Sequence, residues 1–162
     1  MSAQGSGPML AAPCTCACTG PEPPLPTIPQ DVAAFFERYR DSFNALDGAA
    51  IADLYAEPSA MAQGGTLTHW PTRALVRDNM VALCSIYRNK EYGHADFELT
   101  SFIAQGRQYA IADLRWRISW LDAAEPWAFR TTYNLVRTDS GWKVLLCTAY
   151  EEDRFHRSSS AV

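Results

Sequence analysis

The sequence lacks a long apolar run and lacks a cluster of basic residues. No apolar stretch in the 162 residues approaches the roughly 20 that a membrane-spanning helix requires. The 14 basic residues are scattered among 18 acidic ones, and the formal net charge is −4. A nucleic-acid-binding protein needs a basic face to neutralise phosphates. We therefore expect neither a membrane nor a nucleic acid as a partner.

Residues with metal-ligand spacing are also scarce. Cys14, Cys16 and Cys18 lie close together, but structural zinc sites usually space cysteines more widely and need a second ligand pair, which is missing downstream. The three histidines are too far apart to suggest a ligand set. Cys84 and Cys147 lie in apolar stretches and are expected to be buried free thiols. We expect no metal, no cofactor and a reducing, cytoplasmic setting.

Residues 1–29 have neither the basic nor the apolar segment of a secretory signal. They contain seven of the ten prolines, three glycines and one charged residue, Glu22. Such a segment buries too little apolar surface to offset its ordering entropy. The sequence predicts a disordered Pro/Cys-rich leader over 1–29. A translation start placed too early, with Met9 or a later codon as the true start, is at least as good an interpretation of its cysteines as a metal role.

The remaining chain has the composition of one globular domain. Of the whole sequence, 48% is apolar and 20% is charged, which is ordinary for a soluble fold. A chain of this length buries roughly two-thirds of its unfolded surface, so it can fold without stabilisation by disulfide bonds or metal ions. We expect one domain over residues 30–151 and a frayed polar tail over residues 152–162.

The first half of this domain has helical periodicity. Asp31 is a candidate helix cap, and Asp47-Gly48 breaks the helix and begins a second, shorter one that Pro58 ends. A third helix begins at Pro71. The apolar positions of the first helix recur at helical spacing: Val32, Phe35, Phe36, Tyr39, Phe43 and Leu46.

After Gly93 the apolar period changes to two, which is typical of strands. Short connections join four predicted strands, so an antiparallel meander is expected. Two shorter strands flank a turn at residues 63–66. The four long strands cover residues 94–104, 108–121, 127–137 and 142–151. Helices on one face of a curved sheet give an α+β cone with an internal pocket.

Two segments carry a family resemblance. Residues 37–55 contain Asn44-Ala45-Leu46-Asp47 at the helix break, and Gly141-Trp142-Lys143-Val144 opens the last strand. Both resemble the nuclear transport factor 2-like superfamily, especially its SnoaL-like and ketosteroid isomerase-like branches. The resemblance implies a cone-shaped fold with three N-terminal helices packed on a curved antiparallel sheet. It does not imply one function, because this fold hosts many.

The ketosteroid isomerase pattern carries over incompletely. Its helix tyrosine corresponds to Tyr39, its base position to Gln63 and its late acid to Asn134. An amide cannot take a proton at neutral pH, so Gln63 cannot be the general base. Asn134 can still donate a hydrogen bond. The resemblance therefore implies the hydrogen-bond donors of an isomerase without its base.

The epoxide hydrolase and polyketide cyclase branches place a carboxylate on the last strand. That position corresponds to Ala149, with Glu151 two residues later on the same predicted face. The hydrolases also carry an Arg and an Asp two residues apart on a middle strand, and this chain has Asp113 and Arg115 in reversed order. The residue types match, but the complete set does not.

The orientation of the middle strands is left open by the sequence. Asp113, Arg115 and Arg130 alternate with apolar residues, so they face either solvent or the inside of the cone as a polar floor. We take Tyr39, Asp113 and Arg115 as candidate catalytic residues. The candidate ligand-binding residues are Tyr55, Gln63, His69, Arg130, Asn134 and Glu151.

Aromatic residues are dense on the predicted long strands. They pack either under the helices or against a second subunit, and a homodimer is expected. Three function classes stay open: a pocket enzyme using acid–base chemistry on a small apolar metabolite, a ligand-binding protein without turnover, and an assembly domain whose cone is filled by its own side chains.

Overall fold

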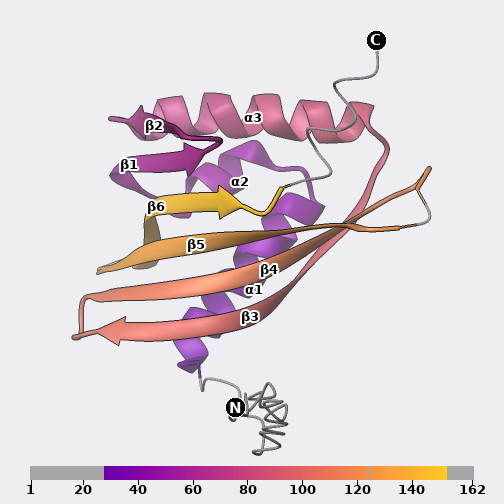
Figure 1. Ribbon diagram of the computed structural model, residues 1–162. Helices are drawn as coiled ribbons and strands as arrows, with labels where there is room; N and C mark the ends of the chain where they lie inside the picture. Colours follow the sequence, from indigo (N-terminus) through magenta and orange to yellow (C-terminus); the bar gives the residue numbers. More distant parts are fainter. Residues whose placement is uncertain (1–27, 124, 153–162) are drawn as a thin grey trace, which may run out of the picture.

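The computed structural model describes residues 28–123 and 125–152, and they form a curved sheet with helices on its concave face (Figure 1). Six strands lie in the order β2-β1-β6-β5-β4-β3. All neighbouring pairs are antiparallel except β1 and β6, which run parallel. The predicted α+β cone is confirmed, although its sheet is mixed. The helices are α1 (Gln30–Asn44), α2 (Gly48–Ala52) and α3 (Arg73–Asn89), and the strands are β1 (Tyr55–Gln63), β2 (Thr66–Trp70), β3 (Tyr92–Gln105), β4 (Tyr109–Trp120), β5 (Trp127–Thr138) and β6 (Gly141–Tyr150).

Helix α1 lies inside the curve of the sheet and supplies much of the core. Val32, Phe35, Phe36 and Tyr39 are buried, as their helical spacing predicts. The ring of Phe36 packs edge-on against Tyr133 of β5, with 5.2 Å between ring centroids. The apolar stripe of α1 therefore fixes the helix against the middle of the sheet.

Asp31 does not cap α1, contrary to the expectation from sequence. The cap position is Pro29, which makes no side-chain cap bond, and Asp31 lies in the first turn. Its carboxylate accepts a hydrogen bond from the indole of Trp142 at 2.9 Å and pairs with Arg137. Asp31 thus ties α1 to the last hairpin of the sheet.

The break between the first two helices is built by two side chains. Asn44 accepts from the Ala95 amide at 2.8 Å and donates to the Ala95 carbonyl at 3.1 Å, which joins the end of α1 to β3. Asp47 accepts from the Ala49 and Ala50 amides and caps α2, as predicted. The Asn-Ala-Leu-Asp motif therefore turns the chain while holding it to the sheet.

Pro58 does not end the second helix. Helix α2 stops at Ala52, and Pro58 lies within β1, joined to Glu57 by a cis peptide bond.

The predicted leader lies almost entirely outside the described residues. Ile28, which is described, is partly buried and packs against the core. No helix among the described residues has both the length and the apolarity to cross a membrane.

Candidate functional site

A cavity of about 350 Å³ lies inside the cone, between α1, α3 and the concave face of the sheet. This volume is within the usual range for small-molecule sites. Its deep wall is mostly aromatic, with Tyr39, Trp116 and Tyr133 among the lining residues. Exposed residues of β2 and α3, including Thr68 and Asn79, line its outer part. The cone is therefore hollow rather than packed solid by its own side chains.

Hydroxyl groups gather at the floor of this cavity. The Tyr39 and Tyr55 hydroxyls are 2.8 Å apart, and the Tyr55 hydroxyl lies 3.5 Å from the sulfur of Cys147. The Tyr133 hydroxyl accepts a hydrogen bond from the Trp116 indole at 3.0 Å. Tyr39, a candidate catalytic residue, and Tyr55, a candidate ligand-binding residue, both line the cavity.

Burial keeps these phenols protonated. Desolvation, followed by the neighbouring Tyr55 and Cys147, holds the pKa of Tyr39 well above its ordinary value. Desolvation likewise raises the pKa of Tyr55 and of Tyr133. Neutral phenols can both donate and accept hydrogen bonds, so the floor can orient a polar group of a ligand without carrying charge.

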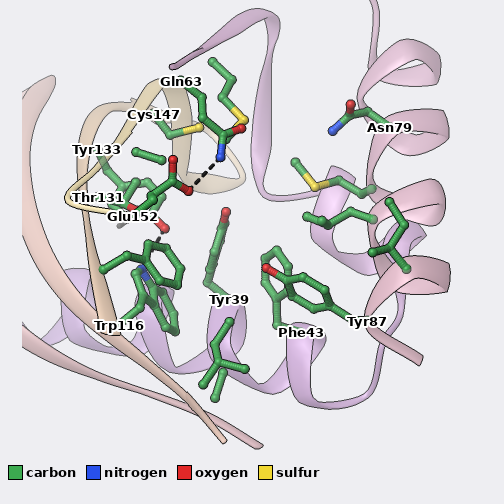
Figure 2. Close-up of a pocket in the computed structure, with 18 of the residues that line it drawn as sticks. Tyr39, Phe43, Gln63, Asn79, Tyr87, Trp116, Thr131, Tyr133, Cys147 and Glu152 are labelled. Carbon is green, nitrogen blue, oxygen red and sulfur yellow. Dashed lines mark hydrogen bonds between the residues drawn. The ribbon is translucent and has the colours of Figure 1, made fainter. Parts of the chain in front are cut away.

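Among the described residues, one carboxylate reaches the cavity, and it belongs to Glu152. Its side chain lines the cavity although only 8% of the residue is exposed. The amide nitrogen of Gln63 donates to a carboxylate oxygen of Glu152 at 2.7 Å. Figure 2 shows this pair on the sheet side of the cavity, above the hydroxyl of Tyr39 and across from that of Tyr87. The position that resembled an isomerase base thus holds an amide that binds a carboxylate.

The backbone at Glu151 explains why the inward acid is Glu152. In a regular strand Glu151 would share the inward face of Cys147 and Ala149. Glu151 instead has a positive φ of 56°, which breaks the alternation after β6. Glu152 consequently turns into the cavity, while Glu151 lines a separate groove on the outer face of the sheet. The sequence-based choice of Glu151, and the assignment of residue 152 to a frayed tail, both differ from the structure.

Asp113 and Arg130 lie on the convex face of the sheet, outside the cavity. Asp113 is 5% exposed, yet its carboxylate is surrounded by partners rather than by ligand space. It pairs with Arg130, and it accepts hydrogen bonds from Thr132 at 2.8 Å and Tyr150 at 2.6 Å. Thr100, at an irregularity of β3, also donates to it. The polar floor proposed for these residues is therefore a polar network on the outer face.

The remaining sequence candidates also lie outside the cavity. Arg115 is exposed and lines the outer groove with Arg130 and Glu151. His69 is exposed on β2, whereas its neighbours Thr68 and Trp70 line the cavity. None of Asn134, Arg115 and His69 is among the cavity-lining residues. Alternation along the strands accounts for these placements, because the inward positions are those of Trp116, Thr131 and Tyr133.

The two cysteines of the described chain are free and buried, as expected. Desolvation raises the pKa of Cys147 to about 11, so its thiol is a weak nucleophile despite lining the cavity. Within the described ranges no three His, Cys, Asp or Glu side chains come together in a way that could hold a metal ion. The polar groups that the described residues bring to the cavity include Glu152, Gln63 and the tyrosine hydroxyls.

Three solved structures show the same fold at low sequence identity. An NTF2-like protein of unknown function from Shewanella oneidensis MR-1 is 16% identical, with a TM-score of 0.62 over 74% of this chain and 95% of that one. A protein of unknown function from Mycobacterium tuberculosis is 18% identical, with a TM-score of 0.61 over 74% and 73%. A ketosteroid isomerase-like protein from Erwinia carotovora atroseptica is 14% identical, with a TM-score of 0.56 over 73% and 91%.

These similarities establish the fold and leave the reaction open. No curated protein matches the sequence. A family model described as NTF2-like protein (DUF6841) matches residues 30–152, about three-quarters of the chain, and includes Glu152. The chain belongs to this NTF2-like family.

Proposed function

We propose that this protein binds a small, largely apolar molecule in the cone and transfers a proton to or from it through Glu152. The single observation that supports this is a carboxylate inside an aromatic cavity, held by Gln63 and facing the tyrosine floor. A carboxylate can accept a proton from a bound molecule and return it elsewhere. The hydroxyl of Tyr39 supplies a neutral hydrogen-bond donor for the charge that develops.

The cavity disfavours the assembly alternative, since a domain serving only assembly has no need of 350 Å³ of internal space. Binding without turnover is the alternative that an experiment must separate. It shares the cavity but requires no proton acceptor. The two parts of the proposal, binding and proton transfer, are therefore tested independently.

Binding is tested with the neutral bicyclic ketone 1-tetralone, using the fluorescence of the lining tryptophans Trp70, Trp116 and Trp127. We expect saturable quenching by the wild-type protein. Ala82→Trp, at the exposed edge of the cavity on α3, should obstruct entry and abolish the signal change that saturates. Val81→Trp, one residue away and outside the lining, is the matched control and should bind normally. Equal binding by both variants would place the ligand elsewhere.

Proton transfer is tested by deuterium incorporation at the carbon next to the carbonyl of 1-tetralone in D₂O, followed by NMR. The wild-type protein should accelerate the exchange, and Glu152→Gln should reduce the acceleration about 100-fold. Glu151→Gln removes an identical group that lines the outer groove, and it should change nothing. If Glu152→Gln binds the ketone and exchanges it as fast as the wild type, Glu152 is not the proton acceptor.

A further inference from the structure

The charge of the cavity is the feature that identifies a class of ligand. Among the described residues that line it, Glu152 is the one acidic side chain, and no Lys, Arg or His lines it. The tyrosine hydroxyls stay protonated because burial raises their pKa. The described part of the lining therefore offers one carboxylate and no cationic side chain.

The walls of the cavity reinforce this negative character. Nine of the lining residues are aromatic, and the faces of aromatic rings attract cations through their negative quadrupole. Figure 2 shows Phe43 and Tyr87 on the helix side of the cavity and Trp116 on the sheet side. Rings therefore stand on both sides of the space that Glu152 faces.

The partner of Glu152 is neutral, which leaves its charge uncompensated within the described chain. Gln63 donates one hydrogen bond, but an amide does not balance a carboxylate. A mostly buried charge without a counter-charge is costly, and an arriving cation relieves that cost. The field of Glu152 also reaches Tyr87, where it adds to the desolvation and to the effect of Tyr92 that raise the pKa of that phenol.

We infer that the ligand of this cone is an organic cation: a substituted ammonium or iminium ion that carries an apolar, ring-sized body. This inference rests on the proposed function, since it names the class of molecule that the same cavity takes. The cationic nitrogen would lie against Glu152 and the aromatic rings, and the apolar body would fill the remaining volume. An anionic ligand would be repelled by both the carboxylate and the negative faces of the rings.

A positive ligand also suits the proposed proton transfer. In an iminium ion the positive C=N group makes the C–H bond on the carbon next to it more acidic. Glu152 would take that proton, the C–H electron pair would form a C=C bond, and the π pair of the C=N bond would move to nitrogen, leaving a neutral enamine. The same carboxylate would then select the ligand and accept its proton.

Three probes of matched shape test this inference: phenyltrimethylammonium, tert-butylbenzene and benzenesulfonate, which are cationic, neutral and anionic. Binding is followed by tryptophan fluorescence at fixed pH and fixed salt. We expect the cation to bind the wild-type protein at least tenfold more tightly than the neutral probe, and the anion to bind weakest. Glu152→Gln should raise the dissociation constant of the cation at least fivefold. It should change the dissociation constant of the neutral probe by less than twofold. Glu151→Gln should alter neither, and the melting temperatures of both variants show that they are folded.

The outcomes separate this inference from the proposed function. The cation inference is wrong if the neutral probe binds as tightly as the cation, or if Glu152→Gln weakens the binding of both probes equally. Either result would still support a ligand-binding cavity. If none of the three probes binds and 1-tetralone also fails, the proposed function is wrong and the inference falls with it. If the anion binds most tightly, the sign of the cavity is the reverse of that inferred.

Discussion

At the scale of single residues, Asp113 shows how a buried carboxylate can be structural rather than catalytic. Desolvation opposes its ionisation, but hydrogen bonds from Thr100, Tyr150, Arg130 and Thr132 outweigh that effect and hold the pKa of the carboxyl below its ordinary value. The charge is therefore fully compensated by its own neighbours. A group satisfied in this way has no remaining capacity for a ligand.

Asp113→Asn should destabilise the protein by about 2–3 kcal/mol, because the amide removes the charge that Arg130 pairs with and cannot accept all four hydrogen bonds. Denaturant unfolding measures this loss. Glu98→Gln, in an exposed pair with Arg117, is the control and should cost less than about 0.5 kcal/mol. Equal stabilities of the two variants would contradict the role assigned to Asp113.

The same carboxylate gives the wild-type protein an acid-sensitive component of stability. Since the pKa of Asp113 is lower in the folded than in the unfolded chain, its stabilisation is complete above about pH 4 and is lost as the pH falls further. Unfolding curves between pH 6 and pH 3 should therefore fall less steeply for Asp113→Asn than for the wild type. If the free energy of unfolding falls equally steeply with decreasing pH in both proteins, a group other than Asp113 dominates the acid sensitivity.

The sequence predicted Asp113 and Glu152 unequally well. Alternation along β4 placed Asp113 on one face with Arg115, but it could not say which face the helices cover. The inward position of Glu152 was not predicted, because Glu151 has a left-handed backbone conformation that reverses the alternation. Glutamate is not a residue type that predicts such a backbone. Tyr39 was predictable, since its position on α1 follows from helical spacing alone.

At the scale of elements, the short helix α2 approaches α3 through a close backbone contact, in addition to the buried side chain of Ile51. Gly48 is buried against α3, and a Cβ at this position would lie 2.6 Å from the backbone nitrogen of Val81. Such a contact involves backbone on both sides and cannot be relieved by a rotamer change. The Asp-Gly pair that reads as a helix break in the sequence is also what lets α2 approach α3.

Gly48→Ala should therefore destabilise the fold by about 2 kcal/mol or more, even though alanine is the better helix former. Thermal unfolding of the variant measures the effect. Ala49→Gly, at an exposed position of the same helix, controls for helix propensity and should cost no more than about 1 kcal/mol. A stabilised Gly48→Ala variant would show that α2 can move away from α3 freely.

At the scale of the whole molecule, the dense aromatic set is explained within one protomer. Trp116, Trp127 and Tyr133 are buried on the concave face beneath the helices, and Phe129 packs against their cluster. This is one of the two interpretations that the sequence left open. The homodimer expected from the sequence no longer has an exposed aromatic face as its reason, and it stays a prediction.

A dimer through the outer face would use the groove that contains Glu98, Arg115, Arg130 and Glu151, whose mixed charges can complement a second copy. Light scattering coupled to size exclusion should then give twice the chain mass of 18.0 kDa. Arg115→Glu should shift that mass toward the monomer. A wild-type monomer at micromolar concentration would contradict the prediction.

The left-handed turn at Glu151 separates the end of the fold from the end of the site. The hydrogen-bonded ladder is complete at Tyr150, so a protein shortened after residue 151 would retain every strand. It would nevertheless lack the cavity's carboxylate, and with it the charge that we expect to choose the ligand. Removal of residue 152 should therefore reduce activity without reducing stability. If Glu152 has the proposed role, a domain boundary drawn from secondary structure alone would yield a folded protein that cannot transfer the proton.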